Sequence, residues 1–198
     1  MKGKKKYGKH RSKHTINFYS DKNRCHVWCE SFLERKYALH CEFDESVVCY
    51  TTQPEYFSVF GKRYTPDFLV CYQSGHAEYV EVKHTSYMRD DFFQKHKHRK
   101  RSIYEMTKLD LILVSEQDFN GVESQNYELL NPYKQIDTTE LLTDIKLFPK
   151  RLTFSKFEKA IEKLSGATKA HAWALVAKHH YRFDVFRPFD ADSMLMRA

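Results

Sequence analysis

The sequence predicts an α+β (α/β) fold: a mixed sheet flanked by helices, followed by a small helical or winged-helix-like C-terminal module. Two alternating runs, at 68–72 and 78–82, flank turn-forming residues and predict an antiparallel hairpin. Helical patterns precede and follow this hairpin, and the continuous apolar run at 109–115 is typical of a central strand covered on both faces. The expected order is helix, three or four antiparallel strands, helix, strand.

The elements before the hairpin follow from local patterns. Apolar residues at helical spacing predict a helix over 26–43, and β-branched and aromatic residues predict a strand over 45–52. Pro54 ends that strand. Residues 56–64, interrupted by Gly61, predict a second hairpin that leads into the first, so we expect a meander of strands laid against the helix.

Length and composition fit a medium-sized domain with a small appendage. The chain has 198 residues, of which 41% are hydrophobic. No apolar run approaches the roughly 20 residues that span a bilayer, and the basic N-terminus has no apolar region behind it. We therefore expect a cytoplasmic protein with no membrane partner.

Positive charge is concentrated at the N-terminus. Residues 1–24 carry nine Lys or Arg against Asp21, which makes +8, so the remaining residues sum to −1 of the total of +7. We interpret residues 1–15 as a flexible basic arm that binds nucleic acid, since phosphate contacts release counterions; a solubilising tail is the alternative. The candidate DNA contacts in the arm are Lys4, Lys5, Lys6, Lys9, Arg11 and Lys13.

A second basic cluster lies on the helix predicted over 89–107. Its Lys and Arg side chains come shortly after the hairpin at 68–82, which carries the candidate active site described below, so they are well placed to bind a phosphate backbone. They are Lys95, Lys97, Arg99, Lys100 and Arg101. A solvated helix face is the alternative interpretation.

The candidate active site comes from the hairpin register. If the turn is centred near Ser74, Asp67 lies opposite Glu81 and Phe68 lies opposite Val80, with Cβ atoms of each pair roughly 5 Å apart. Carboxylate pairs suit Mg²⁺ or Mn²⁺, which lower the pKa of a bound water. Period-2 alternation places Lys83 on the face of Glu81, where its ammonium can stabilise charge on phosphorus.

This spacing matches the PD-(D/E)xK nuclease signature, Pro66-Asp67 followed by Glu81-Val-Lys83. A hairpin with a surface Glu–Lys pair and an Asp beside a turn is the structural alternative. On the preceding helix, Glu30 and Glu34 share a face, and either could reach the metal.

Several motifs in order extend this match. The segments Glu30-Ser-Phe-Leu-Glu34, Phe43-Asp-Glu, Gln53-Pro-Glu, Tyr64-Thr-Pro-Asp67 and Val80-Glu-Val-Lys83 resemble the TnsA family over roughly residues 15–120. TnsA proteins are the endonuclease subunits of heteromeric cut-and-paste transposases. The resemblance implies a restriction-endonuclease-like domain over 16–120 that cuts the 5′ ends of a transposon, beside a DDE transposase and an AAA+ ATPase regulator.

The resemblance also implies roles for the site residues. Glu34, Asp67 and Glu81 would hold Mg²⁺ together with the backbone carbonyl of Val82, and Lys83 would be the catalytic lysine. The choice of Glu34 over Glu30 rests on the resemblance, because spacing does not decide it. When bound to DNA the protein would be associated with the nucleoid.

The remaining chain is expected to form a connector and a module. Residues 121–150 predict a polar connector with one short helix near 139–147. Within 151–198 we expect a helix from the capping box at Ser155 to Leu164, a second at 169–179 and a strand at 181–186. The resemblance implies that this module contacts the ATPase and the transposase; a lid on the core is the alternative. The tail at 192–196 is either a docking segment or a frayed terminus.

The cysteines do not indicate a disulfide framework. Five of them, an odd number, occur in a chain expected to be intracellular, so we interpret them as small buried hydrophobes. Cys25 and Cys29, with His26 and His40, are an incomplete zinc site, since no second short-spaced pair completes it.

Two rivals to a transposase nuclease remain open from the sequence. One is a stand-alone restriction-like or junction-resolving nuclease with the same chemistry. The other is a non-catalytic DNA-binding scaffold that recruits an ATPase or transposase. Such a scaffold would not need Asp67, Glu81 and Lys83 together, so their presence argues against it.

Overall fold

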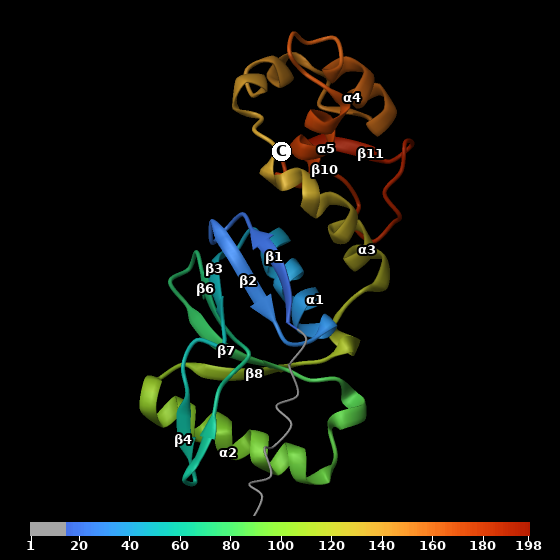
Figure 1. The fold of residues 1–198 in the computed structure, drawn as a ribbon. Helices are drawn as coiled ribbons and strands as arrows, with labels where there is room; N and C mark the ends of the chain where they lie inside the picture. The colour runs from blue at the N-terminus through green and yellow to red at the C-terminus, as the bar shows by residue number, and fades with distance from the viewer. Residues whose placement is uncertain (1–14) are drawn as a thin grey trace, which may run out of the picture.

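The computed structural model describes residues 15–198, and the basic arm residues Lys4, Lys5, Lys6, Lys9, Arg11 and Lys13 lie outside it. The described chain is an α+β protein with a mixed sheet flanked by helices, as the sequence predicts (Figure 1). Within residues 15–198, no helix is both long and apolar enough to traverse a bilayer.

A hairpin, not a helix, forms the start of the described chain. Strands β1 (Ile16–Ser20) and β2 (Cys25–Cys29) pair antiparallel, and helix α1 (Phe32–Phe43) follows. The prediction of a helix from residue 26 is therefore wrong. Val27 and Cys29 are buried while His26 and Trp28 are exposed, an alternation that belongs to a strand. The helix starts only after its N-cap, Ser31.

The main sheet has the order β3-β6-β7-β8. Its strands are β3 (Val47–Thr52), β6 (Phe68–Tyr72), β7 (Ala77–Val82) and β8 (Asp110–Val114). β3, β6 and β7 are antiparallel, and β8 joins β7 in parallel. The hairpin of β6 and β7 is confirmed, but the prediction of a central strand at 109–115 is wrong, because β8 is an edge strand. The chain leaves the sheet after it through the 3₁₀ turn η2 (Glu116–Asp118).

Strands β4 (Phe57–Val59) and β5 (Lys62–Tyr64) form a separate two-stranded hairpin. They do not continue the sheet as a meander, since β3 pairs directly with β6. The hairpin packs on the side of helix α2 (Asp90–Thr107), through a core that includes Phe57, Tyr79 and Ile103.

The two faces of the sheet bury different partners. On one face, Val80 and Val82 join a core with residues of β2 and α1. On the other, Tyr79 and Leu111 pack with β4–β5 and α2. Alternate residues of β7 thus serve opposite layers, which explains why this strand is buried on both faces. The 3₁₀ turn η1 (Thr85–Tyr87) connects β7 to α2.

The segment predicted as a polar connector contains a full helix. Helix α3 (Gly121–Leu130) is capped by Asn120 and packs on α1. Short 3₁₀ turns follow it. They are η3 (Asn131–Gln135), η4 (Thr139–Leu141) and η5 (Asp144–Leu147). The single short helix expected near 139–147 is therefore two separate turns.

The C-terminal module places two helices against a small antiparallel sheet of order β10-β11-β9. Its elements are β9 (Arg151–Thr153), α4 (Phe154–Ile161), α5 (Lys169–Ala177), β10 (Tyr181–Arg182) and β11 (Met194–Arg197).

Several expectations for this module need correction. Helix α4 begins after Thr153, so no capping box forms at Ser155, and it ends before Leu164. The strand predicted at 181–186 is only two residues long. The tail is the central strand of the small sheet with Leu195 fully buried, so it is neither frayed nor a free docking segment.

Candidate active site

Asp67 immediately precedes β6 and lies beside the end of β7, in the predicted register. Phe68 pairs with Val80, and the amide of Asp67 donates to the carbonyl of Val80 at 3.0 Å. The Asp67 side chain turns toward β7, where its Oδ2 accepts a hydrogen bond from the Val82 amide at 2.8 Å. β6 begins only at Phe68, so at the end of this strand the carboxylate takes the place of a backbone partner for the Val82 amide.

Glu34 enters the site from the first turn of α1. Its amide donates to the N-cap side chain Ser31 Oγ at 3.1 Å, and Ser31 Oγ donates back to Glu34 Oε1 at 2.9 Å. The other carboxylate oxygen accepts from the amide of Glu30 at 2.8 Å. These bonds fix the helix start and the Glu34 side chain together. Glu34 is buried whereas Glu30 is only half-buried, so the packing favours Glu34 as the inward carboxylate.

Glu81 points toward α2 and the β4–β5 hairpin. Tyr64 Oη donates to Glu81 Oε2, and Arg99 Nη1 lies 3.0 and 3.1 Å from the two carboxylate oxygens. The Arg99 guanidinium also stacks 4.2 Å from the centroid of the Tyr64 ring. Burial favours the neutral form of Glu81, but contacts from His96 and Tyr64 and the charge of Arg99 outweigh it, so its pKa lies below the ordinary value.

His96 adds a polar atom to this side of the site. Its Nδ1 is buried, makes no hydrogen bond within residues 15–198, and lies 3.9 Å from Glu81 Oε2. A buried nitrogen without a hydrogen bond is uncommon. The nearby His96 and the charge of Arg99 both favour the ionised form of Glu81.

The pKa of Asp67 depends on the other three predicted site residues. Desolvation of this half-buried carboxyl raises its pKa to about 7. The Val82 amide and the Lys83 ammonium oppose that rise, while the carboxylates of Glu34 and Glu81 add to it. The charges of Glu34, Glu81 and Lys83 therefore all act on Asp67, although the Glu81 carboxylate is bound by Tyr64 and Arg99.

Lys83 follows β7 and is half-buried. Its amide donates to the carbonyl of Val114 at 2.8 Å, which ties the backbone to β8. Its Nζ lies 5.7 Å from the centroid of the Tyr87 ring. The backbone is therefore fixed while the ammonium stays at the protein surface, close enough to Asp67 to lower its pKa.

Sequence reasoning missed Cys29 and Tyr64. Cys29 is fully buried, and burial raises the pKa of its thiol to about 12, with Glu34 and Asp67 adding to the rise. Cys29 is thus a protonated, neutral thiol beside the carboxylates. Tyr64 stands three residues before Asp67, but only the fold shows that it meets Glu81. All five cysteines are free thiols, but Cys25 is exposed, so the interpretation of all five as buried hydrophobes is wrong for it.

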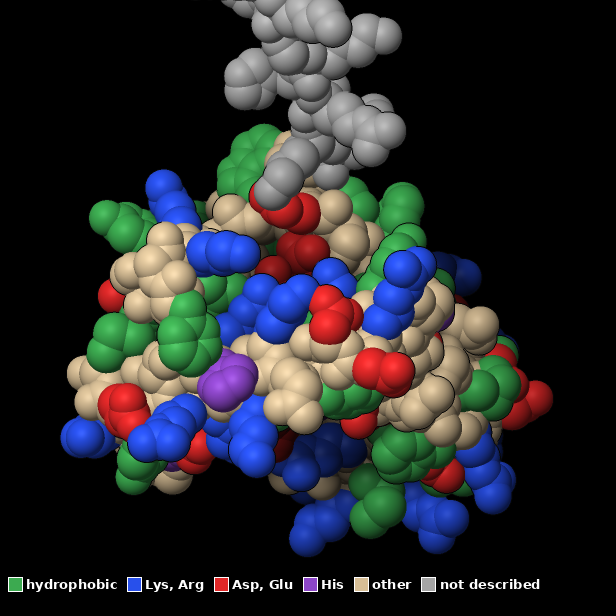
Figure 2. Space-filling view, turned by 90° about the horizontal axis from the view of Figure 1, so that it is seen from below, with side chains coloured by type: hydrophobic (Ala, Val, Ile, Leu, Met, Phe, Trp, Pro, Cys, Tyr) green, Lys and Arg blue, Asp and Glu red, His purple; other side chains and the backbone are tan. Residues whose placement is uncertain are grey.

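The Lys and Arg side chains of the basic cluster on α2 contact different partners. Arg99 faces Glu81, Lys100 lies 3.5 Å from Asp110, and Arg101 donates to Glu105 at 2.8 Å. Lys95 pairs with Asp91 one turn earlier, and Lys97 is exposed. The run is therefore not one continuous basic face. Figure 2 views this side of the molecule and shows Lys and Arg side chains interleaved with hydrophobic and acidic ones.

The donor set suits Mg²⁺ or Mn²⁺ in chemistry. Asp67 and Glu34 offer carboxylate oxygens, the hard ligands that these ions prefer, and the negative charge around Asp67 would be relieved by a cation. Within residues 15–198, no three His, Cys, Asp or Glu side chains are already arranged to hold an ion. Of the three predicted carboxylates, Glu81 is the one turned away from the other two, because Arg99 and Tyr64 bind it.

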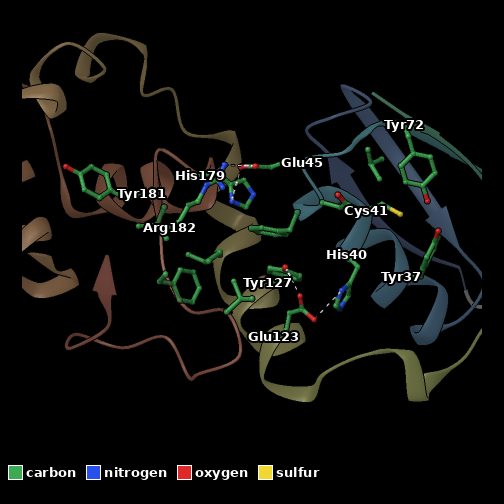
Figure 3. A pocket seen from close by; sticks show the side chains of 17 residues that line it. Tyr37, His40, Cys41, Glu45, Tyr72, Glu123, Tyr127, His179, Tyr181 and Arg182 are labelled. Atoms are coloured by element: carbon green, nitrogen blue, oxygen red, sulfur yellow. Dashed lines mark hydrogen bonds and ion pairs between the residues drawn. The ribbon is translucent and has the colours of Figure 1, made fainter. Parts of the chain in front are cut away.

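A separate cavity of about 560 Å³ lies between the core and the C-terminal module (Figure 3). α1 and α3 form one wall, where Phe43 stacks on Tyr127 with ring centroids 4.4 Å apart. At its rim Arg182 donates to Glu45 at 2.6 Å. None of the four predicted active-site residues lines it.

Comparison with known proteins adds no assignment. No protein-family model matches the chain, and no curated protein matches it.

Proposed function

We propose that this chain is a metal-dependent DNA endonuclease, the subunit of a cut-and-paste transposase that hydrolyses phosphodiester bonds at the 5′ ends of a transposon. The observation that carries the proposal is the position of Asp67 at the end of the β6–β7 pair, where the Val82 amide donates to its carboxylate and the charges of Glu34, Glu81 and Lys83 act on it. Two carboxylates on paired strands, one on a helix and a lysine two residues after the second form the donor set that phosphodiester hydrolysis requires.

Each residue then has a role. Glu34, Asp67, Glu81 and the carbonyl of Val82 would hold Mg²⁺, with Mn²⁺ as a substitute. When bound, the ion lowers the pKa of a water and polarises the phosphate. Lys83 orients the attacking water and stabilises the charge that develops on phosphorus. The Val82 amide holds Asp67 in position through its hydrogen bond.

The proposed function also indicates the binding partners. Exposed cations of α2 such as Lys97 would contact the phosphate backbone. The resemblance to TnsA extends the proposal to a DDE transposase and an AAA+ ATPase as protein partners. Such a protein would work in the cytoplasm, on nucleoid DNA.

One observation favours a second candidate, a non-catalytic DNA-binding scaffold. Arg99 neutralises Glu81 and stacks on Tyr64, so this carboxylate has a cation of its own. In a scaffold that ion pair would be permanent. In a nuclease it would open when the metal and DNA bind.

The test is strand-resolved cleavage of transposon-end DNA in Mg²⁺, with and without the transposase and ATPase. Wild type is compared with Asp67→Ala, Glu81→Ala and Lys83→Ala. We expect 5′ cuts that need the partners and all three side chains, with DNA binding retained in the variants. Cleavage of ordinary DNA by the chain alone would favour a stand-alone nuclease, and cutting by Asp67→Ala at the wild-type rate would exclude this site.

A further inference from the structure

The tip of the β4–β5 hairpin exposes an aromatic side chain in a strained conformation. Phe60 and Gly61 form the two-residue loop between Val59 and Lys62, with φ of 51° and 70°. Two positive φ values define a type I′ turn, in which Asn-Gly is preferred and a bulky residue at the first position is an outlier. The Phe60 residue is nevertheless 76% exposed to solvent.

The hairpin itself is rigidly anchored. Phe57, Val59 and Tyr64 are buried in the core beneath α2, and Phe60 meets the His98 ring edge-on at 5.1 Å. The base of the hairpin reaches the candidate active site, because Tyr64 donates to Glu81. The aromatic tip is therefore held at a fixed position relative to that site.

The surroundings of the tip are cationic. Lys62 and Arg63 follow it directly and are exposed, and the Arg63 guanidinium stacks 4.2 Å from the centroid of the Tyr56 ring. Figure 2 views the end of the molecule that carries this hairpin and α2, where Lys and Arg lie among hydrophobic side chains. An exposed aromatic flanked by cations fits a nucleic acid, because the cations bind phosphates while the ring stacks on a base.

We propose that the β4–β5 hairpin is a DNA wedge in which Phe60 inserts at a base step beside the scissile phosphate while Lys62 and Arg63 bind the backbone. The proposal rests on the proposed function for its partner, duplex DNA. Apolar side chains inserted between base steps unstack them at a cost in free energy, and the cost is smallest where a mismatch has already weakened stacking. A wedge therefore binds mismatched duplex more tightly than matched duplex.

The test measures binding of the full chain to a fluorescein-labelled duplex, matched or with one central mismatch, by anisotropy in EDTA. We expect wild type to prefer the mismatched duplex. Phe60→Ala should lose that preference and bind the mismatched duplex roughly 5- to 150-fold more weakly, the range provided by one base–aromatic stack. Phe60→Trp should keep it. Lys62→Ala should weaken both duplexes alike and lower the salt slope by about one.

Two controls separate binding from folding. Phe60→Asn places a favoured residue in the type I′ turn, so it should melt no lower than wild type and still lose the preference. Phe186→Ala removes a 61% exposed phenylalanine from the C-terminal module and should behave as wild type. Equal binding of both duplexes by wild type, or an unchanged preference in Phe60→Ala, would overturn the wedge.

Cleavage of transposon-end duplexes in Mg²⁺, with the transposase and ATPase present, distinguishes the two proposals. A Phe60-dependent preference without Asp67-dependent cutting would support the wedge and count against the nuclease. Asp67-dependent cutting with no effect of Phe60→Ala on binding would do the reverse.

Discussion

The two ends of helix α1 each bury a glutamate, and the two are compensated differently. Glu42, near the C-terminal end, accepts hydrogen bonds from Ser20 Oγ and Tyr50 Oη, and Lys134 Nζ lies 3.9 Å from it. Glu34, in the first turn, faces Asp67, whose carboxylate accepts one backbone amide and meets two other acids. One end has a balanced charge cluster, and the other has an excess of negative charge.

This difference separates structural from functional acids. Burial lowers the pKa of Lys134 to about 8, yet its ammonium also donates to the Glu42 carbonyl, so the pair joins α1 to the turns after α3. Nothing comparable neutralises Asp67. A carboxyl whose pKa is raised to about 7 by burial, with two neighbouring acids adding to the rise, is a poor stabiliser of a fold and a good candidate for binding a cation.

The largest effect should come from Asp67→Asn, which keeps the size and the hydrogen bond to Val82 but removes the charge. We expect Mg²⁺-dependent cleavage to fall on the order of 10³-fold or more. The free energy of unfolding should stay within about 1 kcal/mol of wild type or rise, since like-charge repulsion is relieved. Paired cleavage assays and urea unfolding measure both. A stability loss as large as the activity loss would place Asp67 among the structural acids.

Glu42→Ala should behave in the opposite way. It leaves Lys134 buried without its carboxylate, and it strands the hydroxyls of Ser20 and Tyr50. Breaking a buried pair from one side costs about 3 to 5 kcal/mol of unfolding free energy. The chemistry at Asp67 should survive wherever the variant is folded. Lys134→Met in the same chain is the matched control and should recover part of the stability; no recovery would mean that the two residues are not coupled.

Arg99→Gln probes the intermediate case, Glu81. Without metal, losing the guanidinium should destabilise the fold by about 1 to 3 kcal/mol, since a buried carboxylate loses a charged partner. Mg²⁺ should then raise the melting temperature of Arg99→Gln more than that of wild type, because the ion and Arg99 compete for Glu81. Arg101→Gln, whose partner Glu105 is exposed, is the control. An equal response of both variants to Mg²⁺ would favour the scaffold with a permanent Arg99–Glu81 pair.

The core of the site could be predicted because it depends on short-range rules. The hairpin register placed Phe68 opposite Val80, and this pairing is observed. Strand alternation placed Glu81 away from Val80 and Val82, as found. The contact between Arg99 and Glu81 joins residues 18 apart across two layers, and no local pattern encodes it.

The errors have a common cause, which is tertiary packing that overrides local pattern. Helix α3 has a weak apolar stripe, but its buried Asn126 amide donates to two carbonyls of the chain before β11. Strand β11 completes a sheet with partners more than ten residues away, so a terminal segment that looked like a docking tail is central. Polar residues whose partners are distant look like connectors in a sequence.

The smallest effect concerns His40, which lies on α1 between the two glutamates. Burial and, to a smaller extent, the charge of Lys36 lower its pKa to about 4. In the unfolded chain the pKa is about 6.5, so the unfolded state takes up the proton first as the pH falls. Stability is therefore intact above pH 6.5 and declines from there toward pH 4.

Between pH 7 and pH 5 the wild type should lose free energy of unfolding. His40→Gln, which can keep the hydrogen bond to Ser124, should lose about 1 kcal/mol less over the same range. The effect is held to this size because Glu123 lies 3.9 Å from the His40 ring and offsets part of the cost of protonation. Urea unfolding at the two pH values measures it, with the exposed His76→Gln as the control. An identical pH dependence in wild type and His40→Gln would show that His40 is protonated in the folded protein, and that the middle of α1 carries a charge pair like the one at Glu42.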